Sequence, residues 1–133
     1  MKAAKHMLAV GAVIAFLLSA FMIFATAKFL EPLGMGTDPK VQLLGQAQGV
    51  LLFSIGVTNW LVRQSDDWAA LRAVLIGNLV AQVISIIINL RGYFTGLETE
   101  GVAAQVGLHV LLGVGYLFFL VRKPAATAAA RAA

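Results

Sequence analysis

Residues 71–91, with the sequence LRAVLIGNLVAQVISIIINLR, restrict the fold more than any other stretch of the chain. About 20 residues at 1.5 Å of rise each let an α-helix cross a bilayer, and no formal charge lies between the arginines near the two ends. Four uncharged polar residues in this stretch are spaced by four, three and four positions, so that they share one helical face: Asn78, Gln82, Ser85 and Asn89. Lipid tails offer no hydrogen bonds, so this face needs partners.

Three further stretches have a similar length and apolar character. The four predicted spans are about residues 7–27, 41–62, 71–91 and 102–121. The chain is 60% apolar and only 12% charged, about half the charged fraction of a soluble domain. We therefore predict an all-α integral membrane protein, a four-helix bundle over residues 1–123 followed by an Ala-rich tail over 124–133. Proline and glycine predict a loop at 29–40.

The basic residues predict the orientation of this bundle. Four spans place both termini and the 63–70 turn on one side, which holds seven basic residues: Lys2, Lys5, Arg63, Arg72, Arg122, Lys123 and Arg131. The other side holds three: Lys28, Lys40 and Arg91. This asymmetry predicts that both termini are cytoplasmic. Because the basic residues lie at helix ends, their net charge does not point to nucleic acid.

Small residues repeat at helical spacing in three of the spans and predict faces where helix backbones approach closely. These predicted packing residues are Gly11, Ala15, Ser19, Gly45, Gly49, Gly77 and Ala81.

Polar side chains of the last three spans are predicted to meet in the outer half of the membrane. At 1.5 Å of rise per residue, Gln46, Ser85 and His109 lie roughly 4–7 Å outward of the midplane. The full predicted set is Gln46, Gln82, Ser85, Asn89, Gln105 and His109. Asn59 and Asn78 form a smaller inner set with Tyr116 in reach.

Two interpretations of the outer set are open. One is a network of hydrogen bonds between helices that fixes their register. The other is a ligand-binding or pore-lining site. A ring of Gln and Asn offers donors and acceptors without charge, which suits a neutral, partly polar guest such as a quinone head group or a carotenoid end group.

His109 adds a more specialised possibility. A neutral imidazole can ligate haem iron or the magnesium of a chlorophyll-type pigment, and Gln105, one turn earlier, is the alternative hydrogen-bond partner. His6, the other histidine, lies at the opposite end of the predicted bundle, so it cannot complete a two-histidine haem site. No other metal site is predicted.

Several chemistries have no support in the sequence. No Asp or Glu lies within the predicted spans, which disfavours proton-coupled carriers such as small multidrug antiporters. The chain has no cysteine, and it has no HExxH, nucleophile-elbow or P-loop motif. We therefore predict that the protein is not an enzyme.

Four segments carry a resemblance that extends over about residues 7–121: FLEPLGMG, LLGQAQGVLLFSIGVTNW, IGNLVAQ and GLHVLLGVGY. With its four spans and a proline-containing loop after the first, the chain resembles small bacterial inner-membrane proteins of unknown function. The resemblance implies a multi-pass protein of the bacterial inner membrane, and it implies neither an activity nor site residues.

These observations favour a non-enzymatic accessory or structural subunit of a larger respiratory or photosynthetic membrane complex, enclosing a lipid, a quinone or a pigment. The expected partners are membrane lipids and other membrane-protein subunits or further copies of the chain. One alternative is a small homo-oligomeric channel or carrier for a neutral or weakly charged solute. Another is a stand-alone membrane protein that binds an apolar ligand.

Overall fold

The computed structural model describes residues 1–36, 38–99 and 101–122, and in these ranges every regular element is a helix. The elements, in chain order, are α1 (Lys2–Phe24), α2 (Thr26–Leu30), the 3-10 helix η1 (Glu31–Leu33), α3 (Pro39–Val62), α4 (Trp68–Phe94) and α5 (Val102–Val121). Four of them, α1, α3, α4 and α5, are long and apolar enough to cross a membrane. The prediction of an all-α fold with four such helices is confirmed. The predicted Ala-rich tail, 124–133, lies outside the described residues.

The helix ends differ from the predicted spans. Helix α1 begins five residues earlier than predicted and breaks at Ala25, whose φ of −134° and ψ of 40° are not helical. The predicted loop at 29–40 starts too early, because α2 and η1 continue the helical path through Leu33. Acidic side chains then fix the starts of two long helices: Asp38 accepts from the Lys40 N–H at 2.8 Å, and Asp67 accepts from the Ala69 N–H at 2.8 Å.

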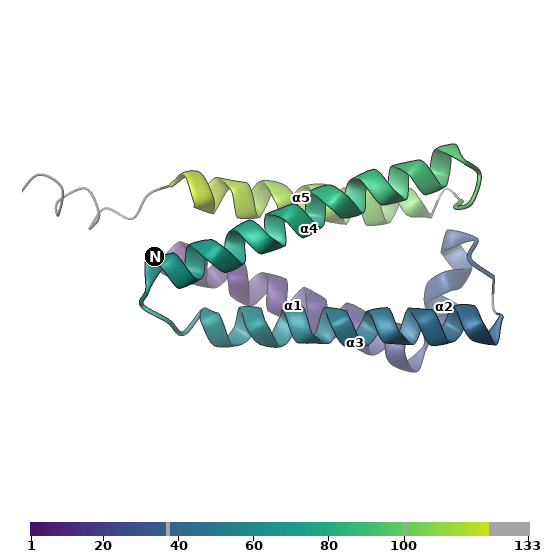
Figure 1. Cartoon of the computed structure of the whole chain (residues 1–133), viewed down its shortest axis with the longest axis horizontal. Helices are drawn as coiled ribbons and strands as arrows, with labels where there is room; N and C mark the ends of the chain where they lie inside the picture. Colours follow the sequence, from purple (N-terminus) through teal and green to yellow (C-terminus); the bar gives the residue numbers. More distant parts are fainter. Residues whose placement is uncertain (37, 100, 123–133) are drawn as a thin grey trace, which may run out of the picture.

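The four long helices form two closely packed pairs, α1 with α3 and α4 with α5 (Figure 1). Glycines of α3 make the first pair possible, because there is little room for a side chain where they face α1 and α2. A Cβ atom at Gly45 would lie 2.8 Å from Thr26, and one at Gly56 would lie 2.8 Å from Phe16. Gly49 faces Ile23 of α1, whereas Gly56, later in α3, faces the earlier residue Phe16, so α1 and α3 are antiparallel.

The predicted packing residues divide into two groups. Five of them are buried between helices: Gly11, Ala15, Ser19, Gly45 and Gly49. The other two are not fully buried: Ala81 is half-buried, and Gly77 is exposed, with nothing within 4 Å of a Cβ atom built on it. Gly77 therefore takes no part in packing within the described chain.

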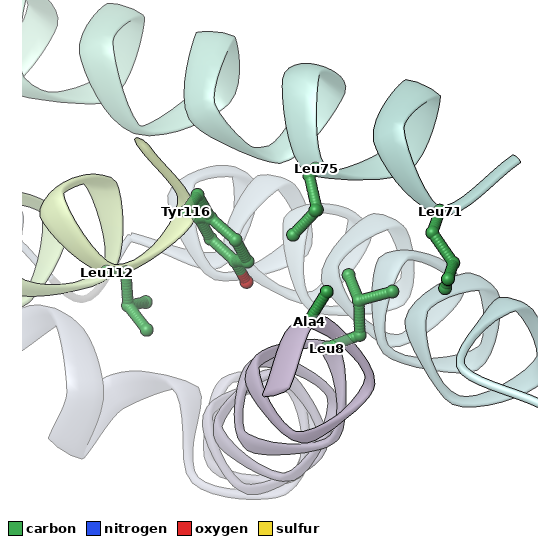
Figure 2. Close-up of a cluster of buried hydrophobic side chains, with 6 residues drawn as sticks. All are labelled: Ala4, Leu8, Leu71, Leu75, Leu112 and Tyr116. Carbon is green, nitrogen blue, oxygen red and sulfur yellow. The ribbon is translucent and has the colours of Figure 1, made fainter. Parts of the chain in front are cut away.

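One end of the molecule, which we call the terminal end, carries residue 1, the 63–67 turn and the end of α5 (Figure 1). Here a hydrophobic cluster from α1, α4 and α5 joins the two helix pairs (Figure 2). Its buried members are Ala4, Leu8, Leu71, Leu75, Leu112 and Tyr116. Beside it, Lys5 Nζ contacts Asp66 Oδ1 at 2.6 Å, and this ion pair and hydrogen bond lower the pKa of Asp66.

The opposite end, which we call the loop end, joins the helix pairs a second time. The Thr99 hydroxyl donates to the Pro32 carbonyl oxygen at 2.6 Å, and the Thr99 N–H donates to the Leu33 carbonyl at 3.2 Å. Nearby, Glu98 packs against Gly92, and burial raises the pKa of the Glu98 carboxyl. The two pairs are thus held together at both ends of the molecule.

Candidate functional site

A cavity of about 590 Å³ lies between the two helix pairs, and residues of all five α-helices line it. We call this cavity the groove. Residues of α3 and α4 line it, and these two helices diverge from the short 63–67 turn that connects them (Figure 1). The hydrophobic cluster joins the pairs toward the terminal end and the Thr99 contacts join them at the loop end, with the groove open between the pairs.

The groove has a buried floor and an exposed mouth. Lining residues from α1 and α5, such as Ala15 and Leu112, are buried or half-buried. The exposed lining residues lie on α3 and α4, where Leu44 is 67% exposed, Leu51 60% and Ile88 59%. The groove therefore opens sideways, between α3 and α4.

The two walls of the groove differ in chemistry. The α4–α5 wall carries most of the polar groups, which are Asn78, Gln82, Ser85, Asn89, Gln105, His109 and Tyr116. The α1–α3 wall is mainly aliphatic, with residues such as Ile14, Leu18, Leu52 and Ile55, and it adds two amides, Gln48 and Asn59. Among the described residues, no carboxylate, lysine or arginine lines the groove. The site is thus amphipathic and uncharged apart from the titratable ring of His109.

His109 is held by Gln82 and not by Gln105, the partner that the sequence suggested. The distance between His109 Nδ1 and Gln82 Oε1 is 2.6 Å. An amide oxygen can only accept a hydrogen bond, so Nδ1 carries the hydrogen and donates it. This bond joins α4 to α5 on the polar wall and fixes the orientation of the imidazole ring.

Asn59 and Asn78 meet at the terminal end of the groove, as their depths predict. The Asn78 Nδ2 group donates to Asn59 Oδ1 at 2.7 Å, and Asn59 is only 1% exposed. The Tyr116 hydroxyl and the Asn59 amide both border Gly11, where a side chain would have no room. The hydrogen bond between Asn59 and Asn78 links α3 to α4, the two helices that form the mouth.

Replacing Asn78 by leucine is expected to lower the free energy of unfolding by about 1–2 kcal/mol, because it leaves the buried Asn59 amide without its partner. Thermal or denaturant unfolding of the purified protein in detergent measures the loss. The Asn59→Leu/Asn78→Leu double variant is the control, since removing both amides should cost less than the sum of the two single changes. Strictly additive losses would contradict a direct bond between the two side chains.

The remaining residues of the predicted outer set do not all lie in the groove. Ser85, Asn89 and Gln105 line the groove. Asn89 Nδ2 is buried and has no hydrogen-bond partner within the described residues. Gln46 lies elsewhere: it is exposed, and its Nε2 donates to the Ile23 carbonyl at 3.3 Å.

Gln48 takes the place in the groove that was predicted for Gln46. The two glutamines are two positions apart, which turns their side chains about 200° from each other around the helix. The predicted outer set missed Gln48, although the sequence holds the signal. Gln48, Leu52, Ile55 and Asn59 repeat the spacing of four, three and four that marks the polar face of α4. This spacing places the four residues on one face of α3, and the structure shows that this face lines the groove.

The described part of the chain brings no three His, Cys, Asp or Glu residues together in a group that could hold a metal ion. His109 is the groove's one imidazole. Comparisons of the chain with protein-family models, with curated proteins and with solved structures found no match. The functional argument therefore depends on the chemistry of the groove.

Proposed function

We propose that this protein is a non-enzymatic membrane protein that binds an uncharged amphiphile, of the lipid, quinone or pigment class, in the groove between its helix pairs. The single observation that carries the proposal is the pairing of a polar wall with an aliphatic wall in one cavity. A ligand with a small neutral head and a hydrocarbon tail matches both walls at once.

The size and opening of the groove support this proposal. A volume of about 590 Å³ falls in the usual range of small-molecule sites, ~300–1,000 Å³. Helices α3 and α4, which flank the mouth, are each long and apolar enough to span a bilayer. A ligand dissolved in the membrane would thus enter from the side, without passing through water.

The charges at the two ends support a cytoplasmic location for the N-terminus. The described residues of the terminal end include five basic side chains: Lys2, Lys5, Arg63, Arg72 and Arg122. The loop end holds Lys28, Lys40 and Arg91. We propose that the terminal end faces the cytoplasm and, from the resemblance described above, that the membrane is a bacterial inner membrane.

Filling the groove is expected to abolish ligand retention. Ala81 lines the groove from α4, so Ala81→Phe places an aromatic ring where the ligand would lie. The protein is purified in mild detergent and extracted with organic solvent, and the extract is analysed by mass spectrometry. We expect a stoichiometric amphiphile in the unchanged protein and at least a tenfold smaller amount in Ala81→Phe, because a ring and a ligand cannot share this space.

Ala73→Phe is the matched control, because Ala73 is exposed on the same helix and does not line the groove. It is expected to retain the ligand. Equal retention by both variants, or a properly folded protein that never carries a stoichiometric amphiphile, would contradict the proposal.

A second candidate function, the accessory subunit, is favoured by a different observation. Gly77 on α4 and Gly107 on α5 are exposed, with nothing within 4 Å of a Cβ atom at either position. Bare glycines on outward helix faces let another transmembrane helix approach closely. Native gel electrophoresis of mildly solubilised membranes tests this: Gly77→Leu and Gly107→Leu should release the chain from a larger species if these faces bind a partner.

We do not propose a channel, because the groove is bounded at both ends. The hydrophobic cluster that includes Tyr116 joins the helix pairs at the terminal end. The contacts of Thr99 with Pro32 and Leu33 join them at the loop end. This arrangement favours a bound guest over a continuous path.

A further inference from the structure

His109 presents one ring nitrogen to a guest, and its chemistry is set by Gln82. Because Nδ1 donates to Gln82 Oε1 at 2.6 Å, the neutral ring keeps a bare lone pair at Nε2. Nε2 has no hydrogen bond within the described residues. The predicted spans hold no carboxylate to balance an imidazolium, so the ring stays neutral. Nε2 is therefore an acceptor and not a donor.

A donor lies further along the same wall. Asn89 Nδ2 is buried and unpartnered within the described residues. Asn89 follows Gln82 by seven residues, roughly 10 Å along the helix axis. This separation is on the scale of one substituted ring with a hydrogen bond at each end, so one ligand could meet the acceptor on α5 and the donor on α4. The groove thus offers an acceptor and a donor to one ligand.

We propose that the groove selects a ligand that carries a hydroxyl group over its carbonyl counterpart, with the hydroxyl donating to His109 Nε2 and Asn89 Nδ2 donating to a second oxygen of the ligand. This inference rests on the proposed function and specifies its ligand: a quinol or another hydroxyl-bearing isoprenoid. The aliphatic wall of Ile14, Leu18 and Ile55 contacts the tail.

The selectivity follows from lone pairs. A carbonyl oxygen has no hydrogen to donate, so opposite Nε2 it would leave the nitrogen unpaired and set two lone pairs against each other. A site built to bond a hydroxyl rejects the analogue that lacks it. Asn89 does not discriminate, because hydroxyl and carbonyl oxygens both accept from its N–H groups.

A quinone and its quinol, which share one carbon skeleton, test the inference directly. The full-length protein is reconstituted in lipid nanodiscs and titrated without oxygen, first with a short-chain alkyl benzoquinone and then with the quinol obtained by reducing it. Empty nanodiscs correct for partition into lipid. We expect the quinol to bind about tenfold tighter than the quinone, within the roughly 5- to 150-fold that one unsatisfied buried polar group typically costs.

Three variants assign the selectivity to its residues. His109→Leu should weaken quinol binding and bring the ratio of the two affinities close to one. His109→Gln guards against misfolding by keeping a polar side chain, and because its amide can both donate and accept, it should reduce the ratio to about threefold or less. Asn89→Leu should weaken both forms by a similar factor and leave the ratio unchanged.

His6→Leu is the control, because His6 is exposed at the terminal end and does not line the groove. It should bind both forms as the unchanged protein does. Equal binding of quinol and quinone to the unchanged protein would overturn the inference while leaving the proposed function intact. Binding of neither form, with no amphiphile in the solvent extract, would overturn the proposed function itself. A visible absorption band lost in His109→Leu would assign Nε2 to a pigment metal and overturn the inference.

Discussion

Replacing Gly49 by leucine is expected to separate α1 from α3 and to lower the free energy of unfolding by about 3 kcal/mol or more. A Cβ atom at this position would lie 2.8 Å from Ile23 Cγ1, 3.0 Å from Met22 Cβ and 3.2 Å from the Ser19 carbonyl oxygen. The last of these atoms belongs to the backbone, so it cannot move aside by a change of rotamer. A leucine adds three more carbons beyond that Cβ, and α1 must shift as a whole to make room for them.

Gly77→Leu is the matched control for Gly49→Leu. Both changes put leucine in place of a glycine within a long helix, and both positions fall in the small-residue repeats of the sequence. At Gly77 nothing lies within 4 Å of the new Cβ atom, so we expect a change within about 0.5 kcal/mol. Unfolding of the two purified variants in the same detergent measures the difference. Similar losses in both would contradict the close contact between α1 and α3.

Replacing Gly101 by alanine is expected to break the join between the helix pairs at the loop end. A Cβ atom there would overlap the Pro32 carbonyl oxygen and lie 2.8 Å from the Pro32 carbonyl carbon. Both are backbone atoms, so η1 and the start of α5 must move apart. Their separation also breaks the two hydrogen bonds from Thr99 to Pro32 and Leu33. We expect a loss of about 2–3 kcal/mol, from two bonds at about 1 kcal/mol each and the displaced packing.

Hydrogen exchange gives this second prediction a local measure. The Thr99 N–H bonds the Leu33 carbonyl at 3.2 Å, so its exchange should accelerate in Gly101→Ala. Gly107→Ala is the control, because Gly107 lies six residues further along the same stretch and has open space around its Cβ position. Unchanged Thr99 exchange in Gly101→Ala would show that the loops do not meet as described.

The polar face of α4 shows how far spacing alone can predict a site. Asn78, Gln82, Ser85 and Asn89 fall on one helical side by arithmetic, and all four line the groove. The spacing of residues within one helix does not specify which residues of another helix they will meet. The sequence therefore suggested Gln105, one turn before His109 on the same helix, as its hydrogen-bond partner. In the structure His109 bonds Gln82 on the neighbouring helix instead.

Gln46 and Gly77 also show that residue type and spacing do not identify a contact face by themselves. Each belongs to a residue type and a spacing typical of a contact face, yet Gln46 bonds the backbone of α1 at Ile23 and Gly77 faces open space. The rotation of the whole helix about its axis determines which neighbour such a residue faces. The rotation depends on the summed packing of all its neighbours, and no single residue reveals it.

Composition and the lengths of the apolar runs were enough to predict four long helices, because crossing hydrocarbon requires about 20 apolar residues and internally satisfied backbone hydrogen bonds. The number of long helices and the uncharged character of the interior could therefore be predicted from the sequence alone. Only the tertiary structure decided that the helices form two pairs with a groove between them, and that most of the polar residues of the groove lie on its α4–α5 wall. The reason is physical: this arrangement depends on contacts between segments far apart in the chain, such as the glycine contacts of α3 with α1, the hydrophobic cluster and the Thr99 hydrogen bonds.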